Sequence, residues 1–150
     1  MTDWKAFFRS IAKGNQKVHF FDPATEAELQ SVKKALGISI PGTLTELLGQ
    51  TNGISGEILR LPYVVGSCEE IIKINQRHEE WLRRDELTVS GKFLFFGENG
   101  QGDSFGYAIE NGQIPSEEIG AYCPIEDEFR LVACDLKEWA IGLYANTLKY

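Results

Sequence analysis

Histidine and cysteine are scarce in this chain of 150 residues, which has only His19, His78, Cys68, Cys123 and Cys134. No pair of cysteines has the CxxC spacing, and the set does not follow the ligand spacing of a zinc site. An odd number of widely separated cysteines also argues against a disulfide framework and favours a reducing compartment. Cys123 and Cys134 follow apolar strand-like residues, where a thiol usually behaves as a small inert hydrophobe. We therefore expect a cytoplasmic protein with no metal, no cofactor and no reactive cysteine.

Long apolar runs and clustered basic residues are missing as well. No run approaches the roughly 20 residues of a membrane-spanning helix, and the N-terminus lacks the pattern of a secretory signal. Residues 1–97 contain 12 acidic and 12 basic residues, whereas residues 98–150 contain 10 acidic and only 3 basic ones. Proteins that bind nucleic acids need clustered Lys and Arg. The sequence thus predicts neither membrane insertion nor direct binding of nucleic acid.

The negative charge is concentrated in one stretch of the second half. From residue 98 to residue 128 there is no Lys or Arg but eight carboxylates: Glu98, Asp103, Glu110, Glu117, Glu118, Glu126, Asp127 and Glu128. Such asymmetry influences which partners approach and how fast. Two interpretations remain open from the charges alone. The carboxylates either solvate loops and strand ends, or they face a partner.

The stretch "FGENGQGDSFGYAI", residues 96–109, raises the question of a phosphate or metal site. A dinucleotide fingerprint would need a third glycine and a following helix, and a P-loop would need a Lys after the glycines. A calcium loop would need ligands continuing at alternate positions, where Phe105 and Tyr107 stand instead. Glycine permits positive φ and Asp can accept bonds from backbone N–H groups. We predict a rigid connector that displays carboxylates; a hydrolase using Glu98 or Asp103 is an open alternative.

Hydrophobic periodicity and capping signals predict the helices. Thr25 with Glu28 and Ser67 with Glu70 form capping boxes. The expected helices cover residues 4–11, 25–37, 41–51, 67–87 and 135–150. His78 falls on the apolar stripe of the fourth helix, where we expect a partly buried, hydrogen-bonded histidine.

Strand signals are grouped near the C-terminal half. They cover residues 57–65, 92–96, 104–109, 118–123 and 129–134, with a hairpin dipeptide at Asn111-Gly112. Grouped strands favour an α+β class over alternating βα units. We expect a single domain over residues 1–150. In it, a mostly antiparallel sheet of about five or six strands is flanked by N-terminal, central and C-terminal helices.

Three stretches resemble the SUKH superfamily, which groups fungal regulators of cell-wall synthesis with many bacterial immunity proteins. Residues 25–53 resemble its opening, with a capped helix, a link ending at Pro41, and a helix ending at Asn52-Gly53. Residues 63–75 resemble the apolar stretch leading into its next helix. Residues 93–109 resemble its strand, loop and strand, with Gly102-Asp103 as the shared dipeptide. We carry Pro41, Asn52, Gly53, Gly102 and Asp103 over as structural signatures only.

The resemblance implies an α+β SUKH-like domain that binds proteins without catalysis. In bacteria it most often implies an immunity protein of a toxin–antitoxin pair, frequently with a nuclease toxin. Nuclease toxins tend to be basic, so an acidic inhibitor surface suits them, and this favours the partner-facing interpretation of the eight carboxylates. The leading hypothesis is therefore an immunity protein for a basic toxin domain. A regulatory or scaffold module that binds a cellular protein is the alternative, the hydrolase comes third, and the oligomeric state is not predicted.

Overall fold

The computed structural model describes residues 1–14, 16–56, 64–85 and 93–150, with residues 81–85 described by their backbone only. The helices in these residues are α1 (Trp4–Ile11), α2 (Glu26–Leu36), α3 (Gly42–Gln50), α4 (Cys68–Asp85) and α5 (Leu136–Ala145). The strands are β1 (His19–Phe20), β2 (Ile54–Ser55), β3 (Phe93–Glu98), β4 (Ser104–Ala108), β5 (Ile119–Cys123) and β6 (Glu128–Ala133). The α+β class is confirmed.

Local side-chain chemistry sets the helix boundaries. Thr25 and Glu28 form the expected capping box of α2, and Gly37 ends that helix in the left-handed conformation at φ 71°. Ser67 and Glu70 bond to each other's backbone N–H groups at the start of α4. Asp135 caps α5 by accepting from the backbone N–H of Glu138. The three N-terminal caps satisfy N–H groups that have no partner inside the helix, and the Gly37 N–H donates to the Lys33 carbonyl.

The strands form two separate antiparallel sheets in the described residues. The pair β1–β2 stands alone, and the other four strands follow the order β3-β4-β5-β6. The four-stranded sheet is strongly curved, since Phe93 of β3 and Phe129 of β6 stack with ring centroids 3.8 Å apart although their strands are the outer ones. Gly120 makes room for this stacking, because a Cβ at that position would lie 2.2 Å from the Phe129 ring.

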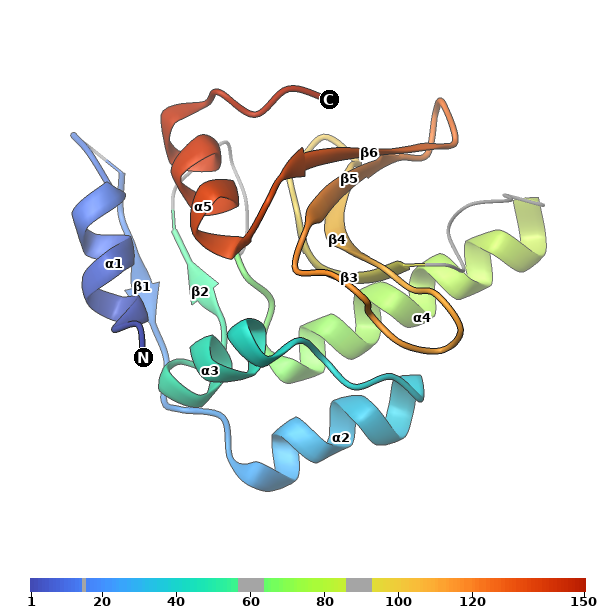
Figure 1. Cartoon of the computed structure of the whole chain (residues 1–150), viewed down its shortest axis with the longest axis horizontal. Helices are drawn as coiled ribbons and strands as arrows, with labels where there is room; N and C mark the ends of the chain where they lie inside the picture. The colour runs from blue at the N-terminus through green and yellow to red at the C-terminus, as the bar shows by residue number, and fades with distance from the viewer. Residues whose placement is uncertain (15, 57–63, 86–92) are drawn as a thin grey trace.

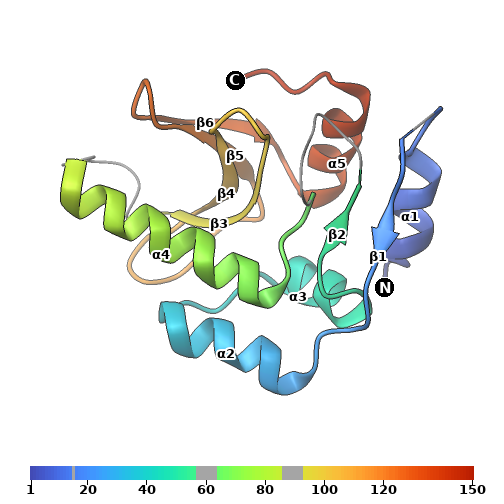
Figure 2. The ribbon, with the colours of Figure 1, turned by 180° about the vertical axis from the view of Figure 1, so that it is seen from behind.

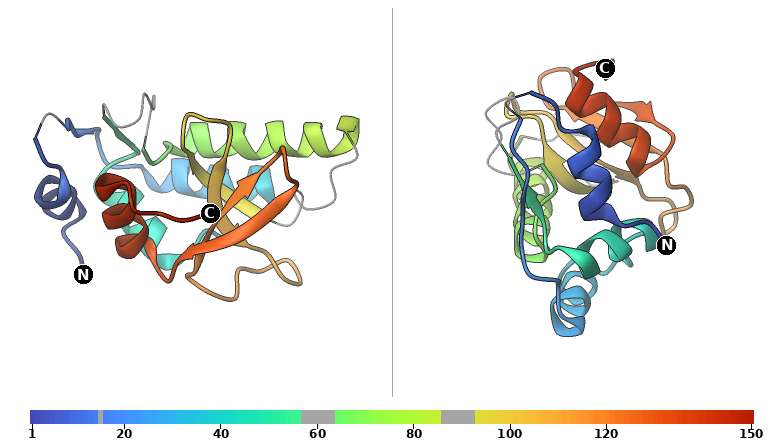
Figure 3. Two further views of the ribbon diagram at one scale, coloured as in Figure 1. Left: turned by 90° about the horizontal axis from the view of Figure 1, so that it is seen from above. Right: turned by 90° about the vertical axis from the view of Figure 1, so that its left-hand side faces the viewer.

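The helices surround the curved sheet on several sides. Figure 1 shows α4 running along the sheet, with α2 on the far side of α4. Seen from behind in Figure 2, α4 crosses in front of β3. The helix α5 lies between the sheet and α1, and the right-hand view of Figure 3 shows α1 in front of the other elements. The four-stranded sheet therefore keeps its hairpin β5–β6 at the periphery of the molecule.

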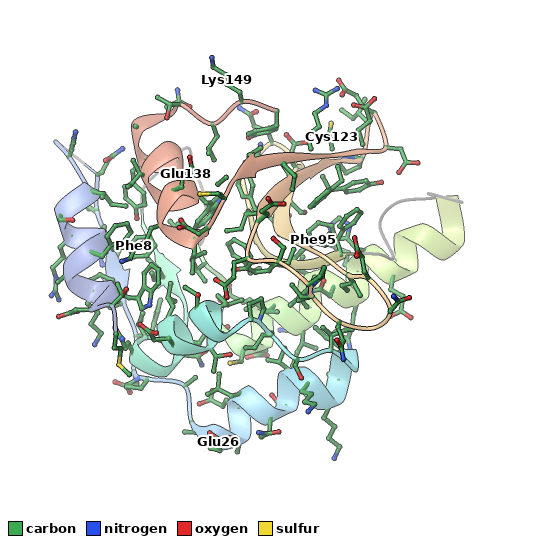
Figure 4. The ribbon with its side chains drawn as sticks, in the orientation of Figure 1. Phe8, Glu26, Phe95, Cys123, Glu138 and Lys149 are labelled. Carbon is green, nitrogen blue, oxygen red and sulfur yellow. The ribbon has the colours of Figure 1, made fainter. Side chains whose placement is uncertain are left out.

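Two clusters of buried apolar side chains stabilise this arrangement. The main core joins all five helices to β2, β4, β5, the middle of β3 and the end of β6, and it includes Trp4, Phe96 and Trp139. A second, smaller cluster lies between α4 and the concave face of the sheet. It consists of Ile74, Phe95 and Tyr122, with Phe93 and Phe129 packed against them; Figure 4 shows Phe95 there.

Some elements expected from the sequence lie outside the described residues, and others differ from the structure. The strand expected at residues 57–65 lies outside the described residues except for its last two positions. The side chains of Trp81 and Leu82, which continue the apolar stripe of the fourth expected helix, also lie outside them. The C-terminal helix ends at Ala145 and not at residue 150, because Asn146 adopts the left-handed conformation at φ 56°. Cys134, which the sequence places at the end of the last strand, is exposed. It follows β6 at the point where the chain turns towards α5.

Candidate functional site

Strand pairing divides the eight carboxylates between the two ends of the sheet. Ser104 pairs with Glu98 on one side and with Tyr122 on the other, so the β3–β4 loop and the β5–β6 turn share one end. The connection between β4 and β5 lies at the opposite end (Figure 1). The first end carries Glu98, Asp103, Glu126, Asp127 and Glu128, and the second carries Glu110, Glu117 and Glu118. The acidic stretch thus forms two groups.

The second group lies on the connection between β4 and β5. The half-buried Glu117 accepts a hydrogen bond from the Thr43 hydroxyl of α3, which attaches the connection to the helical layer. Glu110 flanks the Asn111-Gly112 turn, and its backbone bonds to Gln113. The Glu118 side chain is exposed to solvent, as is that of Glu110. One of these three carboxylates therefore fastens the connection to the fold.

Asn99 organises the β3–β4 loop. Its buried Oδ1 accepts from the backbone N–H groups of Gln101 at 2.8 Å and Asp103 at 3.1 Å. Its Nδ2 donates to Asp103 Oδ2 at 2.9 Å and to the Tyr150 hydroxyl at 2.7 Å. Gly102 adopts a φ of 100°, which side chains disfavour. The loop is a tight connector in which the Asp103 carboxylate and the backbone N–H groups of Asn99, Gln101 and Asp103 are bound within the chain.

Glu98 and Asp103 are held by different parts of the protein. Glu98 forms an ion pair with Arg77 of α4 at 2.7 Å. Asp103 instead accepts from Asn99, on the side of the C-terminal tail. A glycosidase-type pair needs two carboxyl groups flanking one substrate bond, whereas these two are directed at separate partners. The geometry gives no support to the hydrolase alternative.

The β5–β6 turn presents the other carboxylates of this end. Arg130 of β6 pairs with Glu126 at 3.0 Å and with Glu128, all three being exposed. Exposed pairs of this kind stabilise a fold by roughly 0–1 kcal/mol. Asp127 accepts from the Tyr122 hydroxyl at 2.6 Å, and burial together with this bond raises the Tyr122 pKa. Asp127 therefore has a structural role that Glu126 and Glu128 lack.

A cleft of about 370 Å³ opens between the loop, the hairpin and the C-terminal tail. We call it the hairpin cleft; it is lined by Gln101, Asp103, Ala121, Cys123, Glu126, Glu128, Arg130, Leu148 and Tyr150. Figure 4 marks Cys123 at this end of the sheet, below the tail that carries Lys149. Three carboxylates face one guanidinium, so the cleft is net negative. Its chemistry suits a cationic side chain beside the apolar parts of Leu148 and Tyr150.

Neither histidine is placed for metal binding. In the part of the chain that the structure describes, no group of three or more His, Cys, Asp or Glu side chains could hold a metal ion. His19 is exposed on β1. His78 is buried, with Nε2 2.9 Å from the Ser104 hydroxyl, as the apolar stripe predicted. Burial, reinforced by the nearby Arg77, lowers the pKa of His78 to about 4.

Cys68 and Cys134 are not activated nucleophiles. Burial is the main reason why the pKa of Cys68 is raised to about 11. At the exposed Cys134, a hydrogen bond to Glu138 raises the thiol pKa. A reactive cysteine needs a lowered pKa. Both thiols are therefore held in the protonated form.

The signature residues of the first half perform structural tasks. Asn52 Oδ1 accepts from the backbone N–H of Cys68 at 2.9 Å, and its Nδ2 donates to Glu28 at 2.9 Å, so Asn52 joins α4 to α2. Gly53 has a φ of 97°. Pro41 is the N-cap of α3. A second cleft of about 490 Å³ lies beside Asn52; of its three carboxylates, Glu28 and Glu70 cap helices and the third is Asp22.

The sequence analysis missed Asn99, Arg130 and Tyr150 as residues of this site. The Asn99-Gly100 dipeptide is a turn signal that could have pointed to Asn99. Tyr150 carries no such signal, because its contact with Asn99 spans 51 positions.

Comparison with known protein families finds a match to one family model. The model of the SMI1 / KNR4 family (SUKH-1) matches residues 23–142, which is most of the chain. No curated protein matches the sequence. Among the described residues, no helix is both long enough and apolar enough to cross a membrane.

Proposed function

The chain belongs to the SMI1 / KNR4 family (SUKH-1), and from this premise we propose that it is a non-catalytic immunity protein. It binds a basic toxin domain, a nuclease in the leading case, and blocks it from acting inside the producing cell. The family is generally one of non-enzymatic immunity and regulatory modules that interact with proteins. The cytoplasm is the compartment where such a protein would be needed.

The hairpin cleft is the observation that carries this proposal. Asp103, Glu126 and Glu128 come together there from two chain segments, while the opposing charge is the single Arg130. Ile125, at the tip of the adjoining turn, is 93% exposed and adds apolar surface next to the carboxylates. Apolar surface surrounded by charged groups of one sign is typical of a surface that recognises a partner of opposite charge.

Charge should act mainly on the rate of association. Opposed fields raise association rates by about 10- to 1,000-fold at low ionic strength. Exposed carboxylates are screened beyond roughly 8 Å in physiological salt. Binding through the hairpin cleft should therefore weaken as salt is added, chiefly because the complex forms more slowly.

The direct test uses the candidate partner encoded beside this gene, in particular a basic C-terminal domain. Cells that express this domain should stop growing, and co-expression of the present protein should restore growth. If the domain is toxic and growth is not restored, the proposal is wrong for that pair. Capture of a cellular protein that is not toxic would instead favour the regulatory alternative.

A matched pair of charge reversals locates the surface. Glu126→Lys with Glu128→Lys should slow association at low salt by about tenfold or more. The control is Glu110→Lys with Glu118→Lys, which makes the same charge change at the opposite end of the sheet. Both variants should melt close to wild type, because the four side chains are exposed. Equal impairment by the control would place recognition outside the hairpin cleft.

A further inference from the structure

The two edge strands of the four-stranded sheet, β3 and β6, differ in whether other residues bond to their outward-facing backbone. At the β3 edge, the Asn75 side chain of α4 takes the place of a neighbouring strand. Its Nδ2 donates to the Phe95 carbonyl at 2.8 Å, and its Oδ1 accepts from the Phe95 N–H at 2.9 Å. The Gly66 N–H adds a bond to the Phe96 carbonyl. Figure 2 shows α4 covering this edge.

The β6 edge has no such cover in the described residues. The strand Glu128–Ala133 pairs with β5 alone, and no hydrogen bond from the described residues reaches its outward-facing backbone. Edge strands are usually protected by Pro, Lys or a bulge. The strand β6 contains neither Pro nor Lys, and its register shift lies at the C-terminal end, between the pairs Ile119–Ala133 and Gly120–Leu131, so the pairing of Glu128–Leu131 is regular. Its Arg130 forms ion pairs with Glu126 and Glu128. The backbone N–H and C=O groups of alternate residues are thus available to another strand.

The side chains of β6 give this edge two different faces. Glu128 and Arg130 lie on the side of the hairpin cleft. Phe129 lies on the opposite side, against Phe93. Leu131 shares the face of Phe129, because side chains alternate along a strand, and it is 59% exposed. A strand added here would meet negative charge on one face and apolar surface on the other.

We infer that β6 is the docking edge for an extended segment of the partner protein, which joins the sheet as a fifth strand. The segment alternates basic residues, which face Glu128 and the hairpin cleft, with apolar residues, which face Leu131. Backbone hydrogen bonds provide affinity in this mode of recognition, and the alternating side chains provide specificity. This inference rests on the proposed function in that the partner is a basic protein.

A second copy of this chain is a poorer occupant of the edge. Each copy carries a net charge of −7, so two copies would repel each other as they approach. Charge complementarity therefore selects a basic segment.

The test measures amide hydrogen exchange of the full chain by NMR, with the probe peptide acetyl-Lys-Val-Lys-Ile-Lys-Val-amide. In the free protein, alternate amides of β6 should exchange fast, while the Phe95 amide, bonded to Asn75, should exchange slowly. Saturating peptide should slow the fast β6 amides by tenfold or more. A peptide N-methylated at alternate residues should bind at least tenfold more weakly, because it lacks the required donors.

Two variants of the chain check the position of the peptide. Leu131→Lys places a positive charge on the docking edge and removes its apolar contact, so it should weaken binding by at least fivefold. The matched control is Ile141→Lys on α5, where an apolar side chain is also exposed; it should bind the peptide as wild type does. Equal weakening by both variants would overturn the inference.

Three other outcomes would refute the docking edge at β6. The inference is wrong if no peptide binds at about 1 mM, if both peptides bind equally well, or if the free protein is a dimer with protected β6 amides. Assays with a candidate toxin separate the two proposals. If the toxin is neutralised but the β6 amides still exchange fast in the complex, the docking edge is refuted and the immunity function stands. If the toxin is not neutralised but the peptide protects the β6 amides, the immunity function is refuted and the docking edge stands.

Discussion

Replacing Asn99 by Ala should loosen the end of the sheet that carries the hairpin cleft. The substitution removes two acceptor contacts to backbone N–H groups and two donor contacts, to Asp103 and Tyr150. A hydrogen bond contributes about 1 kcal/mol net, and an unpaired buried group costs more. Water can reach part of this loop, since Gln101 is exposed. We therefore expect the free energy of unfolding to fall by about 2–4 kcal/mol.

Urea denaturation measures this loss, and the aromatic signals of Tyr150 report on the tail. The Tyr150 ring packs edge-on against Phe105 with centroids 5.8 Å apart, so its NMR shifts should move towards those of an exposed tyrosine in Asn99→Ala. The neighbouring Gln101→Ala is the control and should stay within about 0.5 kcal/mol of wild type. An Asn99→Ala protein as stable as the control, with the Tyr150 shifts unchanged, would refute this account of the loop.

Substitutions at three further positions test the fold by urea denaturation. The stability provided by neutral His78 is complete above pH 6.5 and is lost as the pH falls towards its folded pKa of about 4, because the unfolded chain binds the proton first. This lowering of the His78 pKa corresponds to about 3 kcal/mol in the free energy of unfolding. His78→Gln should remove this part of the pH dependence, and stability curves of variant and wild type that run parallel with pH would contradict the prediction. Gly102→Ala should cost about 1 kcal/mol through backbone strain alone, since no atom lies within 4 Å of the added Cβ, and Gly102→Asn should cost less. Gly120→Ala should cost about 1–3 kcal/mol by displacing the Phe129 ring, and a variant as stable as wild type would show that this packing is not tight.

Features encoded by a few neighbouring residues were predictable from the sequence. The capping boxes at Thr25 and Ser67 and the left-handed Gly37 each depend on contacts within one helical turn. The buried, hydrogen-bonded state of His78 followed from its place on the apolar stripe of α4. The α+β class followed from the grouping of the strands.

Features that depend on distant pairing were not predictable. The division of the carboxylates follows from which strands pair, so that Asp103 and Glu128 share an end while Glu118, closer to Glu128 in sequence, lies at the other end. The cover of the β3 edge depends on Asn75, 20 positions before Phe95. Periodicity indicates which face of an element is buried, but it does not say which elements meet.

The separation of the two apolar clusters affects how this protein can change over generations. The distal half of the β5–β6 hairpin is anchored by Tyr122 and Phe129 in the smaller cluster, and residues 124–128 contribute no side chain to either cluster. Substitutions in that turn therefore leave the packing around Trp4 and Trp139 intact. A lineage facing a new partner can alter the turn residue by residue without first acquiring compensating mutations in the main core. The main core and the proposed recognition surface can then evolve at different rates.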